Sequence, residues 1–238
     1  MATGHHPSGQ MRYGAVSYLN ACPLIEGLEP LTLDTPSGLA RRVDAGELDV
    51  SLLPVAAAVG LDLARVGSLG IAAEGPVDSV LLFLRCPVAE LRSVRLDPAS
   101  RTSRVLARVL LREVHDVDPR VVDHGDADAE LLIGDAALIR WAAGDEQFID
   151  LAAAWTAWTG LPFVFAAWYG DQAAEAELEA AYARGKQRID AYAQDSDLPL
   201  AAPLLASYLR ERIRFRIGPR ESEGLARFLE LSRAHGLL

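Results

Sequence analysis

Short apolar runs alternate with amphipathic stretches along the first 85 residues of the chain. Alternating positions predict an opening strand, and continuous apolar runs predict buried strands after it. The expected strands lie at residues 12–18, 31–33, 48–53, 67–73 and 78–84, and the expected helices begin near Pro23, Pro36 and Val55. Because short connections join these strands to helices, the order favours a parallel sheet with helices on its faces.

A second series of strands and helices follows the Cys86-Pro87 break. Its expected strands lie at residues 93–96, 121–122, 130–133 and 148–151, and its expected helices at residues 101–113 and 136–141. Residues 46–54 and 129–135 look alike. Each is an acidic turn, a buried strand and a polar residue at the strand's carboxyl end, where open α/β sheets bind ligands. This similarity predicts two comparable lobes.

The last third of the chain changes character after a strong apolar strand at residues 163–168. Residues 172–193, 200–214 and 219–235 are charged, alanine-rich and helical by period, with one short strand at 213–217, and we expect them to pack on the first lobe. The predicted α/β chain has a disordered leader at residues 1–10 and a ligand cleft between two lobes. Lobe one is residues 11–85 plus 161–238, and lobe two is residues 86–160.

A cluster of hydroxyls lies where the strand at 93–96 ends and the next helix begins. Ser100, Thr102 and Ser103 fall within four positions of the predicted helix start, and Arg101 adds a positive charge. Free backbone N–H groups and the positive end of the helix dipole favour a carboxylate or phosphate there. The alternative is that Ser100 only caps the helix.

Composition removes several classes of function. The formal net charge of −10 disfavours nucleic acid, whose phosphates are bound by basic surfaces. The apolar run at residues 52–61 is interrupted by Pro54 and Gly60 and is too short to span a bilayer, so no membrane partner is expected. Without an apolar export segment, we expect a soluble, cytoplasmic protein. Cys22 and Cys86 lie far apart and the histidines form no ligand-spaced cluster, so neither a disulfide nor a metal site is expected.

Five stretches, taken in order, resemble the chorismate dehydratase family of the futalosine route to menaquinone. They are residues 16–20 with 23–24, 46–54, 100–103, 132–135 and 159–168, which include the strings V-S-Y-L-N, S-R-T-S and T-G-L-P-F-V-F-A. The resemblance implies the two-lobed fold of type II periplasmic solute-binding proteins. It also implies dehydration of chorismate, a small dicarboxylate, to 3-[(1-carboxyvinyl)oxy]benzoate, with no metal or organic cofactor.

The matching motifs point to a set of site residues. Asn20 and Asp135 are the expected catalytic-site residues, and the expected substrate contacts are Ser17, Tyr18, Ser79, Ser100, Arg101, Thr102, Ser103, Gly160 and Leu161. An amide such as Asn20 can donate to a carboxylate and accept from a hydroxyl at once, which suits positioning, and a substrate carboxylate can then act as the base. The alternatives are Asn20 as a turn residue, and Asp135 either as the base or as the cap of a helix beginning at Ala136.

Other functions remain compatible with the same fold. They are a non-enzymatic receptor for a small carboxylate solute, the effector-sensing domain of a regulator, and the sister enzyme 1,4-dihydroxy-6-naphthoate synthase. The sister enzyme lacks the S-Y-L-N opening found at residues 17–20. No helix-turn-helix with a basic surface favours a regulator, and the sequence does not indicate an oligomeric state.

Overall fold

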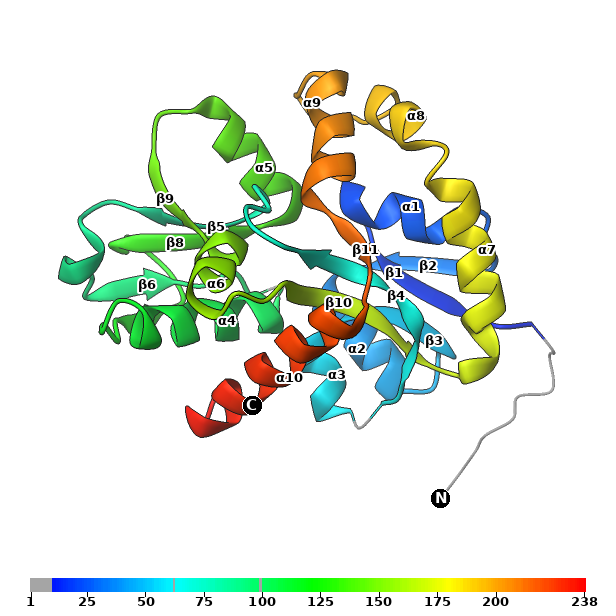
Figure 1. Cartoon of the computed structure of the whole chain (residues 1–238), viewed down its shortest axis with the longest axis horizontal. Helices are drawn as coiled ribbons and strands as arrows, with labels where there is room; N and C mark the ends of the chain where they lie inside the picture. The colour runs from blue at the N-terminus through cyan, green and yellow to red at the C-terminus, as the bar shows by residue number, and fades with distance from the viewer. Residues whose placement is uncertain (1–9, 62, 99) are drawn as a thin grey trace.

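The computed structural model describes residues 10–61, 63–98 and 100–238, which form two lobes side by side (Figure 1). Except for Gln10, the leader predicted at residues 1–10 lies outside the described residues. The first lobe is built on a six-stranded sheet of order β11-β4-β10-β3-β1-β2, and the second on a five-stranded sheet of order β7-β6-β8-β5-β9. The predicted two-lobed α/β architecture is confirmed.

The two sheets share one pattern of strand directions. The strands of the first sheet are β1 (Tyr13–Val16), β2 (Leu31–Asp34), β3 (Val50–Pro54), β4 (Arg65–Ala73), β10 (Phe163–Gly170) and β11 (Arg214–Arg216). Those of the second are β5 (Val80–Leu84), β6 (Ser93–Arg95), β7 (Arg120–Val122), β8 (Ala129–Ile133) and β9 (Gln147–Asp150). A parallel trio, β2-β1-β3 or β7-β6-β8, is extended in each sheet by an antiparallel strand, β10 or β5. The lobes are therefore comparable, as predicted.

Both sheets are mixed, so the expectation of a parallel sheet is wrong. β10 and β5 are the strands that enter each sheet directly after the chain has crossed from the other lobe, and both run against their neighbours. A strand that is buried on both faces is apolar throughout, whichever way it runs. Its direction therefore leaves no signal in the hydrophobic pattern.

The first crossover precedes β5, whereas the sequence prediction placed it after Arg85. Val80–Leu84 pairs with β8 and β9 and thus belongs to the second sheet. The return crossover runs from the end of α6 at Thr159 to the start of β10 at Phe163. The apolar run at residues 80–84 suits either sheet, and the Cys86-Pro87 break that suggested the boundary only ends the strand.

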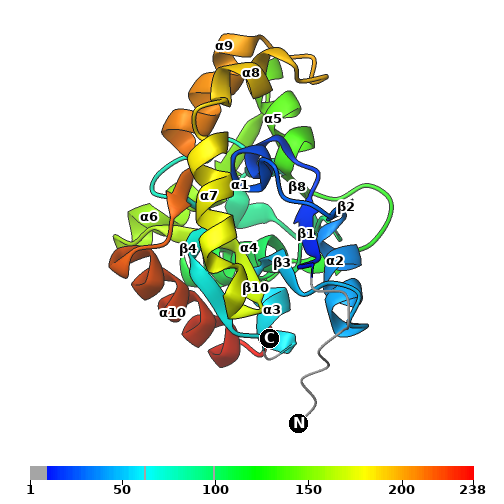
Figure 2. The same cartoon turned by 90° about the vertical axis from the view of Figure 1, so that its right-hand side faces the viewer.

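Helices cover the faces of both sheets. They are α1 (Cys22–Ile25), α2 (Pro36–Asp44), α3 (Val55–Gly60), α4 (Arg101–Glu113), α5 (Gly134–Ala143), α6 (Leu151–Thr159), α7 (Glu175–Gly185), α8 (Ile189–Gln194), α9 (Ala202–Ser207) and α10 (Pro219–Ala234). Short 3₁₀ turns are η1 (Leu19–Ala21), η2 (Val88–Glu90) and η3 (Gln172–Ala174), and η4 (Tyr208–Arg212) is a π-helix. The helical stretches predicted at 172–193 and 200–214 are therefore each divided. α7, α8 and α9 lie on the first lobe (Figure 2).

The C-terminal helix contacts both lobes. α10 packs against β10 of the first sheet and α4 of the second lobe, and it runs along one side of the molecule in Figure 1. Trp155 of α6, Phe163 of β10 and Phe228 of α10 meet edge to face, with ring centroids 4.9–6.2 Å apart. Such aromatic contacts add about 0.5–1.5 kcal/mol each beyond area burial. This cluster fixes the return crossover.

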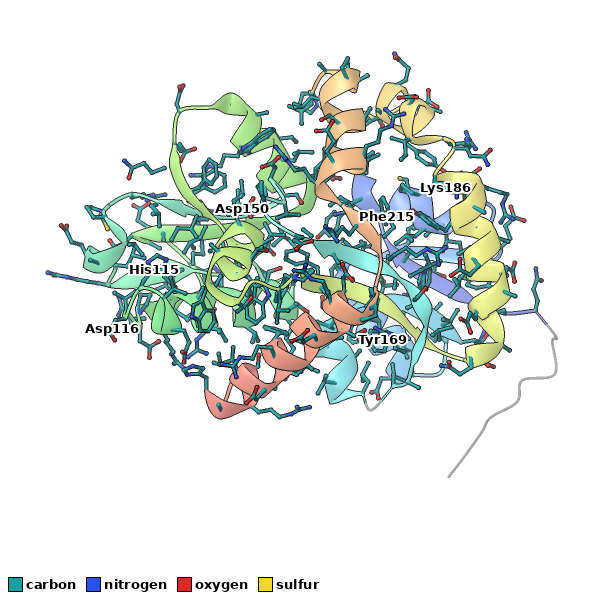
Figure 3. The ribbon with its side chains drawn as sticks, in the orientation of Figure 1. His115, Asp116, Asp150, Tyr169, Lys186 and Phe215 are labelled. Carbon is teal, nitrogen blue, oxygen red and sulfur yellow. The ribbon has the colours of Figure 1, made fainter. Side chains whose placement is uncertain are left out.

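A buried carboxylate fixes the other crossover. Asp150, labelled in Figure 3, ends β9 and caps α6, where its Oδ1 accepts the N–H groups of Ala152 and Ala153 at 3.0 Å. Its Oδ2 accepts the N–H groups of Val77 and Asp78, both at 2.8 Å, in the segment that leads into β5. Burial raises the pKa of the Asp150 carboxyl, and the four N–H donors stabilise its charged form.

None of the helices in the described part of the chain is long and apolar enough to cross a membrane.

Candidate functional site

A cavity lies between the two sheets, at the carboxyl ends of β1, β3 and β8. Its volume is about 520 Å³ when all space between the atoms is counted, including solvent at its opening. Its wall consists of Val16, Tyr18, Asn20, Pro36, Pro54, Ile71, Val77, Ser79, Val80, Ser100, Ser103, Ile133, Gly134, Phe165 and Ala166. None of the described residues in this wall carries a formal charge. The wall combines apolar surface with hydroxyls and one amide, so it can orient a compact polar ligand.

Three helix N-termini lie in this wall of uncharged residues. α2 begins at Pro36, α4 follows its N-cap Ser100, and α5 begins at Gly134, and all three residues lie in the wall. The N-terminus of a helix carries the equivalent of roughly half a positive charge and has N–H groups without intrahelical partners. An anion can therefore be held here although the chain as a whole has a net charge of −10.

Ser100 and Ser103 bring hydroxyls into the wall from the start of α4. The Oγ of Ser100 accepts the backbone N–H of Ser103 at 3.2 Å, which confirms the predicted N-cap. The same Oγ donates to the Oγ of Ser103 at 3.0 Å. Both side chains are buried and both line the cavity. Because the Ser103 oxygen accepts this bond, its own proton can be donated to a ligand.

Thr102, the third hydroxyl of the motif, makes a bond between the lobes. Its Oγ1 accepts the backbone N–H of Ala56 at 3.0 Å, and both residues are buried. Thr102 belongs to α4 of the second lobe and Ala56 to the first turn of α3 in the first lobe. The side chain lies outside the cavity wall, so the predicted substrate contact does not fit its position. Side chains one residue apart on a helix point about 100° apart, which separates Thr102 from Ser103.

Asn20 is joined to Ser79 through a tyrosine that the sequence prediction missed. Asn20 lies in η1, which begins three residues after the end of β1, and its Nδ2 donates to the hydroxyl of Tyr208 at 3.0 Å. Tyr208 in turn donates to the Oγ of Ser79 at 2.9 Å. The Oδ1 of Asn20 is buried and has no partner among the described residues. Burial raises the pKa of Tyr208, so its hydroxyl stays protonated.

Tyr18 packs against the start of α5. A Cβ built on Gly134 would lie 2.9 Å from Cδ1 of Tyr18, and Gly134 has a φ of +60°. Glycine is therefore required here both for its backbone conformation and for the close approach of the ring. The N–H of Gly134 also donates to the carbonyl of Ser79 at 2.7 Å. Burial raises the pKa of Tyr18 to about 12, so this phenol is neutral at pH 7.

Asp135 lies outside the cavity wall and bonds to the other lobe. Its Oδ1 accepts the backbone N–H of Leu19 at 3.2 Å. α5 begins at Gly134 with Ile133 as its N-cap, so the predicted capping of a helix that begins at Ala136 is wrong. The strand continues to Ile133 and the helix starts without an intervening loop, which moves Asp135 into the first turn. Burial raises the pKa of its carboxyl, and the Leu19 bond opposes this rise.

Four further residues predicted to contact substrate lie away from the cavity wall. Ser17 is exposed, because it follows the buried Val16 and points to the opposite face of the strand end. Gly160 is the exposed left-handed C-cap of α6, and Leu161 lines a surface hollow beside α10. Arg101 is exposed in an outer depression that shares Pro36 and Pro54 with the cavity wall. These side chains do not reach the cavity as the structure stands.

The described residues contain no group of three histidine, cysteine, aspartate or glutamate side chains that could hold a metal ion. Cys22 and Cys86 are free thiols. The polar groups of the cavity wall are the amide, the hydroxyls and the helix N-termini described above.

Comparison with known proteins places the chain in a family. Residues 11–234 match the family model described as menaquinone biosynthesis. The chain belongs to the menaquinone biosynthesis family. Similar proteins include a chorismate dehydratase of Campylobacter jejuni, 28% identical over 95% of this chain and 100% of the relative. Another is a chorismate dehydratase of Thermus thermophilus, 31% identical over 67% of this chain and 68% of the relative.

Solved structures show that this member of the menaquinone biosynthesis family has a periplasmic-binding-protein-like fold. A protein from Archaeoglobus fulgidus matches with a TM-score of 0.70 at 15% identity, covering 98% of this chain and 100% of that one. The alkanesulfonate-binding protein SsuA from Xanthomonas axonopodis, bound to MOPS, matches with a TM-score of 0.65 at 16% identity, covering 98% and 96%. At these identities the likeness establishes the fold.

Proposed function

We propose that this protein is a chorismate dehydratase, which converts chorismate to 3-[(1-carboxyvinyl)oxy]benzoate and water. The observation that carries the proposal is the interlobe cavity, where an amide, three serine hydroxyls and three helix N-termini meet in a wall without charged side chains. The names of the relatives and the family membership support it. A dicarboxylate is a ligand that such a wall can hold with donors alone.

The reaction is a redox-neutral elimination. The C–H bond at the ring carbon bearing the enolpyruvyl ether and the C–OH bond of the neighbouring carbon break, a ring double bond forms, and the proton and hydroxide leave as water. Because the product is aromatic, the equilibrium is favourable. The protein then has to hold the leaving hydroxyl and the base in a reactive geometry.

Different residues of the wall hold different parts of the substrate. Ser100 and Ser103, with the start of α4, hold one carboxylate. Asn20 lies across the cavity wall in the first lobe and positions the reacting part of the ring. The second carboxylate of the substrate acts as the base, since none of the described side chains in the wall is a strong base.

Incubation of the purified protein with chorismate tests the proposal. We expect chorismate to be consumed and the enolpyruvyl benzoate to accumulate, as followed by chromatography with mass detection. The matched control is Ser100→Ala with Ser103→Ala, which should raise KM because the Ser103 donor to the carboxylate and the Ser100 hydroxyl that orients it are both lost. Tight binding of chorismate without consumption would instead indicate a receptor, and neither binding nor turnover would leave the sister enzyme as the alternative.

A further inference from the structure

We propose that Tyr208 is a positioning residue that fixes the direction of hydrogen bonding in the cavity, making Asn20 an acceptor and Ser79 a donor toward the substrate. This inference rests on the proposed function, because it assigns the substrate groups that each side chain meets. The motifs that indicated Asn20 and Ser79 do not include Tyr208.

The direction follows from counting protons. A phenol has one proton, and Tyr208 donates it to the Oγ of Ser79 at 2.9 Å. Its oxygen then accepts from the Nδ2 of Asn20 at 3.0 Å. The Asn20 amide is held with its donor on Tyr208, and its Oδ1 remains buried without a partner among the described residues. Ser79 accepts from Tyr208 and keeps its own proton free to donate.

The opposite orientation of the amide is unfavourable. If Oδ1 faced Tyr208, the phenol would donate to Asn20 and Ser79 would have to donate to the phenol, and the NH₂ group would be left in a buried position with two unpaired donors. An unpaired buried donor costs about 1–3 kcal/mol. Asn20 is only 8% exposed and Tyr208 only 4%, so water cannot readily satisfy the lost bonds. The chain of bonds therefore has one favoured direction.

The local backbone holds Tyr208 at this position. It is the first residue of the π-helix η4 (Tyr208–Arg212), and π-helical turns are frequently found at functional sites. At the other end of this turn, Arg212 donates to Asp78 at 2.6 Å. Asp78 has a positive φ of +59° and directly precedes Ser79 in the crossover between the lobes. Tyr208 at the start of η4 is thus bonded to Asn20 and Ser79, and Arg212 at its end is bonded to Asp78, the residue before Ser79.

Asn20 and Ser79 would then bind different groups of the substrate, Asn20 as an acceptor and Ser79 as a donor. The Oδ1 of Asn20 can accept the proton of the hydroxyl that leaves as water, which orients the C–OH bond. Ser79 can donate to a carboxylate or ether oxygen. A buried amide fixed in this way distinguishes a ligand that has a hydroxyl from an analogue that lacks it, because the acceptor would otherwise stay unpaired.

Tyr208→Phe tests the proposal against a matched control, Tyr192→Phe. Tyr192 also donates its hydroxyl to a side chain, but it lies in α8, and its partner Glu26 is not a residue of the cavity wall. We expect Tyr208→Phe to lower kcat by on the order of 10- to 100-fold with KM changed by less than about threefold, since a small misplacement of a positioned group has this effect. Tyr192→Phe should keep the wild-type kcat. An equal loss of kcat in both variants, in step with their melting temperatures, would overturn the proposal.

A double-mutant cycle with Asn20→Ala shows whether Tyr208 acts through Asn20. Once the amide is absent, removal of the Tyr208 hydroxyl should change kcat by less than about twofold, whereas independent roles would give multiplied losses. Ser79→Ala provides a second break in the chain of bonds if Tyr208→Phe does not fold. A Ser79→Ala variant with unchanged kcat and unchanged selectivity for the hydroxyl of the substrate would contradict the assignment.

A substrate-free measurement separates this inference from the proposed function. In the free protein, the side-chain amide signal of Asn20 in a ¹⁵N spectrum, identified by its loss in Asn20→Ala, should exchange slowly with solvent. Tyr208→Phe should speed this exchange at least tenfold and Tyr192→Phe should not. Fast exchange in the wild type would refute the fixed direction, even if chorismate is dehydrated. Slow exchange without turnover would instead refute the proposed reaction.

Discussion

Replacing Thr102 by valine tests whether this hydroxyl joins the two lobes or contacts substrate. In the structure its Oγ1 accepts the Ala56 N–H at 3.0 Å across the interlobe boundary, and Thr102 is 1% exposed. Valine keeps the shape but leaves the Ala56 N–H buried without an acceptor, which costs about 1–3 kcal/mol. When the lobes separate, water can satisfy this N–H. The cost therefore falls on the closed form alone.

This cost sets the size of the expected effect. The ratio of closed to open molecules should fall by about 5- to 150-fold, and ligand affinity should weaken by up to the same factor if the ligand binds the closed form. X-ray scattering should show a larger radius of gyration for ligand-free Thr102→Val than for the wild type. Calorimetry with chorismate or its product should show the weaker affinity.

The control is Thr102→Ser, which keeps the hydroxyl and should restore both the radius of gyration and the affinity. A valine variant that binds as tightly as the wild type and has the same radius of gyration would refute the interlobe role. Weaker affinity with an unchanged radius of gyration would instead indicate that Thr102 contacts the substrate, as the sequence predicted.

Three further predictions follow from single contacts. Asp150→Ala removes the acceptor of four backbone N–H groups and should lower the free energy of unfolding, measured by urea titration, by more than about 3 kcal/mol. A loss below about 1 kcal/mol would show that Asp150 does not hold the crossover in place. Burial raises the pKa of Asp135 above its ordinary 3.8, so the wild type should lose free energy of unfolding as the pH rises through the pKa of the folded protein. Urea titrations from pH 4 to 7 should therefore show Asp135→Asn gaining stability relative to the wild type. A constant difference between the two would contradict this. Gly134→Ala should weaken ligand binding more than Gly144→Ala. Both glycines have a positive φ, but only a Cβ on Gly134 would contact the Tyr18 ring. Equal affinities of the two variants by calorimetry would exclude a role for that contact.

The hydrophobic pattern predicted most elements of the fold but not how the chain divides between the sheets. The helix predicted at residues 101–113 and the short strand at 31–33 occur nearly as expected, because caps and apolar periodicity mark them locally. The placement of β5 depends on pairing with β8 and β9, which are about 50 to 70 residues away. Its own residues are suited to either sheet.

The candidate site shows the same limit. Asn20, Ser79, Ser100 and Ser103 lie together in the cavity wall, as the motifs suggested. Asp150 could have been recognised as a cap, since an aspartate precedes the apolar helix L-A-A-A. Tyr208 carries no local signal, because its role arises from a π-helix and from two bonds that span 129 and 188 residues of chain.

We propose that the substrate reacts at the cavity wall around Asn20 and that Asp135 is not the base. Asn20→Asp places a negative charge beside a dianion and removes an amide donor, whereas Asp135→Asn keeps an oxygen that can accept the Leu19 N–H.

Turnover of chorismate by these two variants, measured beside calorimetric binding, is the most direct test. We expect Asn20→Asp to lose turnover by at least about 100-fold and Asp135→Asn to retain most of it. An active Asn20→Asp enzyme beside an Asp135→Asn enzyme that binds chorismate but does not convert it would show instead that Asp135 is the base.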